Sequence, residues 1–138
     1  GLLKKNRWQS TDLSTASGTG LNTTHATFNN LVTGRTYRAT AILNLNFTHP
    51  VTDGFGAFRI NHDSTDILLF VIDVEQAQAA YDSRCTHMFD IIFTASASSV
   101  ILKGTDWSST TPVLTGSGQS LFRIEELNNY ESETTDFT

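Results

Sequence analysis

Apolar and polar residues alternate almost without interruption along the stretch RTYRATAILNLNFT, residues 35–48. Successive side chains of a β-strand point to opposite faces of the sheet, so this pattern predicts one long strand. We expect its apolar face to line the core; that face consists of Tyr37, Ala39, Ala41, Leu43, Leu45 and Phe47. The opposite face combines one apolar residue, Ile42, with Arg, Thr and Asn residues, and this raises the question of what covers it.

Shorter stretches with the same period-two pattern are separated by polar turns. They predict strands at 5–11, 24–30, 55–62, 66–75, 87–96, 99–105, 112–114 and 120–130. We expect a tight hairpin at 97–99, and a turn of helix or a strand extension at 74–83, where alanine is frequent. Seven to nine strands joined by short links and long loops are typical of a β-sandwich or barrel with Greek-key or jelly-roll connections.

The length and charge of the chain limit the classes of protein to which it can belong. Its 138 residues suffice for one core, so we predict a single domain over 1–138, with disordered ends at 1–4 and 131–138. Only 17% of the residues are charged, against about 25% on average, which is typical of an extracellular or virion β-protein. The net charge of −5 and the lack of a Lys/Arg stripe argue against a nucleic-acid partner.

Cysteine content and chain ends add two further expectations. Cys85 is the only cysteine, so the chain has no intrachain disulfide and no Cys-based metal site. The longest apolar runs fall well short of the roughly 18 residues of a membrane span, and we expect no membrane insertion. The chain begins with Gly1 and has no signal peptide, so we interpret it as the C-terminal fragment of a longer protein.

Four segments together suggest a family. They are FNNLVTGRTYR (28–38), ILLFV (67–71), SVILKG (99–104) and SLFRIEEL (120–127). In this order they resemble the C-terminal jelly-roll domains of bacteriophage tail fibres and tailspikes, which are similar in fold to C1q/TNF-like trimeric domains. The resemblance implies an all-β, two-sheet antiparallel β-sandwich of jelly-roll topology. It also implies a homotrimer at the distal tip of a fibre in the virion tail, outside the cell, that binds a host polysaccharide or lipopolysaccharide without a cofactor.

No catalytic or metal-binding set can be assembled from the sequence. A G-x-S-x-G motif is absent, and the Asp73/Glu75 pair on one strand face is more typical of a solvated surface than of a glycosidase. The turn NHDSTD (61–66) offers His62, Asp63 and Asp66, which are too few ligands for calcium and fit an Asx-type turn instead. We therefore predict no enzyme, no catalytic residue and no metal.

Glycan binding has local candidates. A sugar offers C–H groups to an aromatic ring and hydroxyls to polar side chains, and Trp107 follows Asp106 in a polar loop, GTDWSSTT. Alternatively, Trp107 folds back on the edge of the sandwich or packs at a subunit contact. Tyr81 with Arg84, and Tyr130 near the end, are further candidate ligand-binding residues.

A subunit interface is the second candidate site. The segment DILLFVIDV (66–74) is apolar on both faces, with Ile67, Leu69 and Val71 on the face opposite to Leu68, Phe70 and Ile72. A strand apolar on both faces needs cover on both, and a neighbouring subunit or a long loop of the same chain would supply it. We assign Ile42 and Trp8 to this interface as well; Trp8 alternatively belongs to the core.

The function predicted from these patterns is attachment of a phage to its host through a trimeric tip domain. A structural trimerisation cap without ligand binding is the first alternative. A small carbohydrate-active enzyme is the second, and it lacks a catalytic constellation.

Overall fold

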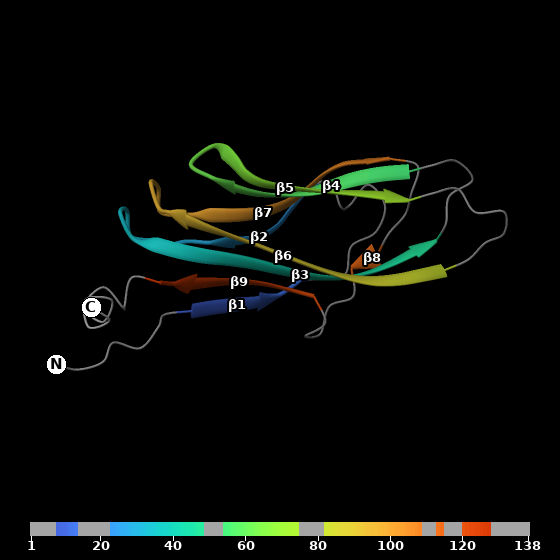
Figure 1. The fold of residues 1–138 in the computed structure, drawn as a ribbon, viewed down its shortest axis with the longest axis horizontal. Coiled ribbons are helices and arrows are strands. Elements are labelled where there is room, and N and C mark those ends of the chain that lie inside the picture. Colours follow the sequence, from blue (N-terminus) through green and yellow to red (C-terminus); the bar gives the residue numbers. More distant parts are fainter. Residues whose placement is uncertain are drawn as a thin grey trace, which may run out of the picture.

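The computed structural model describes residues 8–13, 23–48, 54–74, 82–108, 113–114 and 120–127, and within them the chain forms β-strands and no helix (Figure 1). In chain order the strands are β1 (Trp8–Asp12), β2 (Thr24–Phe28), β3 (Thr36–Thr48), β4 (Gly54–His62), β5 (Thr65–Val74), β6 (Asp82–Thr94), β7 (Val100–Ser108), β8 (Val113–Leu114) and β9 (Leu121–Glu126). Among these residues there is accordingly no helix of the length and apolarity that crossing a membrane requires.

The strands form two antiparallel sheets that lie one above the other (Figure 1). One sheet has the order β1-β9-β3-β6, with β8 also pairing with β3, and we call it the β3 sheet. The other has the order β2-β7-β4-β5, and we call it the β4 sheet. Among the described strands, only β4 and β5 are neighbours both in sequence and in a sheet, so the chain passes repeatedly from one sheet to the other. This is a two-sheet β-sandwich of jelly-roll topology, as the sequence predicts.

The burial of residues in the long strand β3 confirms the prediction made from their alternation. Ala39, Ala41, Leu43 and Leu45 have no exposed surface, and Tyr37 is 6% exposed; the side chain of Phe47 lies outside the described part of the chain. The rest of the core comes from both sheets and includes Phe28, Phe58, Ile60, Leu102 and Phe122. The rings of Phe28 and Phe122 stack across the two sheets with centroids 5.3 Å apart. The apolar face of β3 therefore lies in the centre of the sandwich.

The connection between β6 and β7 differs from the predicted hairpin. β6 belongs to the β3 sheet and β7 to the β4 sheet, so residues 95–99 cross between sheets instead of turning within one. Buried His62 holds this crossing in place: its Nδ1–H donates to the Ser99 carbonyl at 2.7 Å, and its Nε2 accepts from the Ser96 amide at 3.0 Å. β6 also begins at Asp82, earlier than predicted, so strand structure occupies the end of the Ala-containing segment.

The β4–β5 connection is the hairpin that the polar turn predicts. Asp63 and Ser64 have φ angles of 52° and 61°, and His62 pairs with Thr65. Two central residues with positive φ define a type I′ turn, whose twist matches that of the flanking strands.

Candidate functional site: a polar network on the β4 sheet

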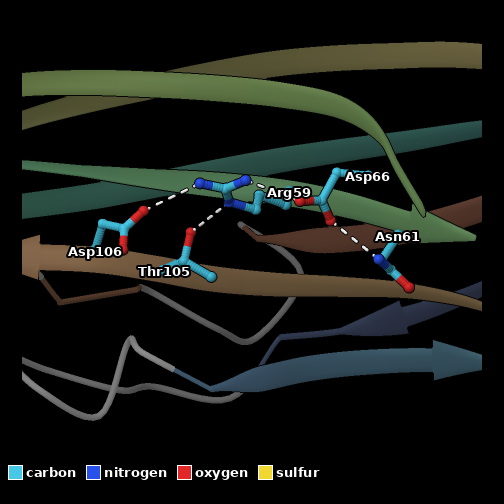
Figure 2. A network of polar contacts seen from close by, with 5 residues as sticks. All are labelled: Arg59, Asn61, Asp66, Thr105 and Asp106. Atoms are coloured by element: carbon cyan, nitrogen blue, oxygen red, sulfur yellow. Dashed lines mark hydrogen bonds and ion pairs between the residues drawn. The ribbon is translucent and has the colours of Figure 1, made fainter. Parts of the chain in front are cut away.

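A connected set of polar side chains lies on the outer face of the β4 sheet, and we call it the Arg59 network (Figure 2). The Arg59 guanidinium donates to three neighbours: to Asp66 Oδ2 through Nη1 at 2.8 Å, to Asp106 Oδ2 through Nη2 at 3.0 Å, and to Thr105 Oγ1 through Nε at 2.8 Å. Asn61 Nδ2 donates to the other oxygen of Asp66 at 3.0 Å. The two charged pairs therefore share one cation, which fixes both carboxylates.

The pairing of three strands brings the network together. Arg59 and Asn61 are two residues apart on β4, so both point outward from the same sheet face. The register between β4 and β5 shifts after Ile60 and places Asp66 opposite Asn61. Strand β7 supplies Thr105 from the other side of β4. The network thus combines residues that are up to 47 positions apart in the sequence.

A β-bulge in β7 decides where Asp106 and Trp107 point. Phe55 pairs with Ser108 and Ala57 with Thr105, so β7 has one residue more than β4 between these pairs. Asp106 has a φ of 62°, a left-handed conformation that Asp adopts more readily than most residues. Simple alternation would place Trp107 on the outer face with Thr105. The bulge instead leaves Asp106 exposed and turns Trp107 inward.

Trp107 therefore does not occupy the exposed loop that the sequence predicts. It lies in β7, is 6% exposed, and meets the ring of Phe58 edge-on with centroids 5.4 Å apart. Its indole covers Gly56 so closely that a Cβ there would lie 2.6 Å from Cε2. The alternative in which Trp107 folds back onto the sandwich describes this position. A buried ring offers no face to a sugar, and of the predicted pair only Asp106 is accessible.

The contacts of the Arg59 network favour the charged forms of Asp66 and Arg59. Hydrogen bonds from Asn61 and from Arg59 lower the pKa of the Asp66 carboxyl. Hydrogen bonds to Asp66 and to Asp106 raise the pKa of Arg59. All three charged side chains remain in contact with water, with exposed fractions of 28% for Arg59, 32% for Asp66 and 62% for Asp106. The network is thus an ordered surface that water can reach.

The other predicted ligand-binding residues lie outside the part of the chain whose side chains the structure describes. Tyr81 and Tyr130 lie outside the described residues. Arg84 belongs to β6, where its backbone pairs with Asn46, but its side chain is not described. The same holds for Trp8, whose backbone pairs with Glu125 in the β3 sheet.

The predicted interface residues lie on opposite outer faces of the sandwich. Ile42 is half-buried on the β3 sheet, directly across from Met88 on β6. Leu69 and Val71, by contrast, are on the β4 sheet, beside Arg59 and Ala57, and are 50% and 56% exposed. One flat contact between two subunits cannot cover both positions.

Ile67 is not part of the outward-facing row with Leu69 and Val71. Ile60 pairs with Leu68 and Asn61 with Asp66, so Ile67 is the extra residue of a bulge in β5. Its side chain packs against the core cluster instead. Ile67 therefore does not lie on the outer face with Leu69 and Val71, where the alternation predicts it, because a one-residue insertion changes the face on which a side chain lies.

Sequence reasoning missed two exposed apolar residues of β6 and the centre of the polar network. Met88 and Ile92 are 69% and 52% exposed on the outer face of the β3 sheet. The run MFDII, with apolar residues at both odd and even positions, carries this signal. Alternation alone also places Arg59 and Asn61 on one outer face, but the sequence does not show that Asp106 faces them.

The turn considered for metal binding distributes its side chains among separate partners. His62 bonds to the crossing at 95–99, Asp63 accepts from the Ser96 hydroxyl at 2.8 Å, and Asp66 belongs to the Arg59 network. Across the described segments, no group of three or more His, Cys, Asp and Glu side chains is placed to hold a metal ion. Asp73 is exposed opposite Phe55, and its predicted partner Glu75 lies outside the described segments.

Comparison with known proteins assigns the chain to no family. No protein-family model matches the chain. No curated protein matches it either. Among solved structures, it is similar to one described as Eiger TNF from S. frugiperda, with 8% sequence identity and a TM-score of 0.45. The similarity covers 67% of this chain and 60% of that one, so it spans less than two thirds of the TNF chain.

Proposed function

We propose that this chain is the homotrimeric distal tip domain of a phage tail fibre or tailspike, and that it binds a host-surface glycan during attachment. The phage assignment rests on the resemblance of segments 28–38, 67–71, 99–104 and 120–127 to such domains. The jelly-roll topology is compatible with it, as is the low fraction of charged residues.

The proposal of an oligomer rests mainly on the exposed apolar residues of the outer face of the β3 sheet. Met88 and Ile92 are more than half exposed there, and Ile42 lies directly across from Met88. Exposed apolar side chains grouped on one face are typical of a protein contact, since isolated ones are common but groups are not. Charged groups of both signs surround them in two loose ion pairs, Arg38–Asp90 at 3.7 Å and Arg123–Glu125 at 3.4 Å. A face with both signs of charge can complement another copy of the same chain.

A trimer would cover this face and leave the β4 sheet accessible. Contacts around a threefold axis are heterologous, so the β3 sheet of one subunit meets a different surface of the next. We place this second surface outside the β4 sheet, so that Leu69, Val71 and the Arg59 network remain accessible three times per assembly. Three weak sites on one tip bind a repetitive surface far more tightly than one site does.

The oligomer is tested by light scattering after size exclusion at two protein concentrations. We expect a mass of three 15.2 kDa chains for the wild type. The variant Met88→Asp should dissociate it, because a charge would have to be buried in the contact. Val32→Asp is the matched control, since Val32 is 43% exposed in the loop between β2 and β3. A wild-type monomer at both concentrations would contradict the proposal.

Binding separates attachment from a purely structural role. Wild-type trimer is applied to bacterial cells and to an array of bacterial glycans, and saturable binding supports attachment. A stable trimer that binds neither would support the structural cap. Release of reducing sugar ends from the array material would support the carbohydrate-active enzyme.

A further inference from the structure

We propose that the Arg59 network together with the exposed Leu69 is the glycan-binding site, and that it takes a neutral hexose residue. This inference rests on the proposed attachment function and adds the place and the ligand chemistry. It replaces Trp107, whose ring is buried, with side chains on the outer face of β4, β5 and β7.

The first argument is the set of ordered acceptors that the network presents to water. Asp106 uses Oδ2 for Arg59, is 62% exposed, and its Oδ1 accepts from no other described side chain. Figure 2 shows the amide oxygen of Asn61 on the side away from Asp66, to which its nitrogen donates. Sugar hydroxyls are donors, and hydrogen bonds to ionised acceptors are about twice as strong as those between neutral groups.

The second argument is that these acceptors are already fixed. Arg59 donates to both Asp66 and Asp106, so neither carboxylate has to be ordered by the ligand. Ordering a flexible side chain at an interface costs about 0.5–1.5 kcal/mol. A network held by one guanidinium avoids most of this cost, which matters for a ligand as small and as well hydrated as a single sugar residue.

The third argument is an apolar surface beside the acceptors. Leu69 is the register partner of Arg59, and Val71 follows two residues later on the same face. Directly paired side chains have Cβ atoms about 4.5–5.5 Å apart, so Leu69 adjoins the polar network. A pyranose ring presents C–H groups on one face and hydroxyls around its edge. It can therefore cover Leu69 while its hydroxyls reach the carboxylates.

The charge of the site selects neutral ligands. Arg59 and its register partner Lys103 contribute two positive charges, and Asp66 and Asp106 contribute two negative ones. These four charges sum to zero, and the guanidinium is already shared between two carboxylates, so the site offers no excess positive charge to a uronic acid. The net charge of −5 also disfavours the approach of a polyanion.

The test compares wild type with Asp106→Asn and Asp73→Asn on immobilised bacterial polysaccharides of two kinds, neutral and uronic-acid-containing. Asn tolerates the positive φ of residue 106, so this variant removes a charge without straining the bulge. Asp73 lies on the same face of β5 but pairs with Phe55, four residues from Arg59, and it controls for the change in net charge. Melting temperature and light scattering confirm that both variants fold and assemble.

We expect wild type and Asp73→Asn to bind the neutral polysaccharide equally, and Asp106→Asn to bind at least tenfold more weakly. Leu69→Ser should weaken binding as well, whereas Val32→Ser should not. Equal binding by wild type and Asp106→Asn would overturn this site and leave the attachment function standing. Binding confined to the acidic polysaccharide, and lost on adding salt, would overturn the ligand class. No binding by the wild type to either kind would overturn both the site and the attachment function.

Discussion

The close contact between Gly56 and Trp107 makes a quantitative prediction about packing in the core. A Cβ added at Gly56 would overlap Cδ2 and Cε3 of the Trp107 indole. The indole cannot move away freely, because it is 6% exposed and lies against Phe58. The backbone of Gly56 is not in the left-handed region, so Gly56→Ala is opposed by this overlap alone.

Overpacking of a core costs about 1–3 kcal/mol, and we expect Gly56→Ala to fall near the upper end because the obstacle is a rigid ring. In a Trp107→Leu background the overlap disappears. The same substitution should then be neutral or stabilising by up to about 1 kcal/mol, since Gly is unfavourable inside a strand. The double-mutant cycle should therefore show a coupling energy of about 2 kcal/mol or more.

Urea denaturation at a single protein concentration measures this cycle. For a urea m-value of about 1–3 kcal/mol/M, the expected loss shifts the midpoint of Gly56→Ala by roughly 1 M. Parallel measurements on Trp107→Leu and on the double variant complete it. If Gly56→Ala costs the same in both backgrounds, the indole is not what excludes a side chain at position 56 and the reasoning fails.

Three further predictions concern a buried hydroxyl, a histidine and two residues in turns. Ser120→Ala should lower the free energy of unfolding by about 1–3 kcal/mol in the same urea assay, because the buried Ser120 hydroxyl accepts from the backbone amide of Asn44 at 2.9 Å. Ser120→Thr keeps a hydroxyl and should therefore lower it less. Burial lowers the pKa of His87, so the unfolded chain binds a proton at this residue more readily, and the free energy of unfolding should fall as the pH drops below about 6.5. In thermal melts His87→Leu should flatten this dependence of stability on pH, and an unchanged dependence would exclude His87 as its cause. Ser64 and Gly34 both have positive φ angles, so Ser64→Gly should leave the melting temperature unchanged or raise it slightly, and Gly34→Ala should lower it by several degrees. A lower melting temperature for Ser64→Gly than for Gly34→Ala would contradict the turn geometry.

Local pattern was sufficient for most of the strands and for the fold class. The alternation along β3 fixes which residues are buried, because a strand with one apolar face has only one way to cover it. The polar turn at Asp63 and Ser64 likewise determined the β4–β5 hairpin. Both features depend only on residues that are close together in the sequence, so the sequence alone predicts them.

The errors share one physical cause, which is that bulges and sheet crossings depend on partners far away in the chain. One extra residue in β7 turns Trp107 inward, and one in β5 moves Ile67 to the core. The segment after β6 crosses to the other sheet because His62, on β4, binds it. For the same reason the sequence indicated Asp106 as a site residue but not its contact with Arg59.

The position of β5 at the edge of the β4 sheet also bears on how one chain meets another. Among the described strands only β4 pairs with β5, so one side of the segment ILLFVI has no strand partner. A long apolar edge is a template for strand addition from another chain and a site of aggregation. Asp66 and Asp73 flank this segment, and charges at both ends oppose the stacking of identical strands. Asp66 thus fixes Arg59 in the folded protein and also places a charge at one end of this apolar edge.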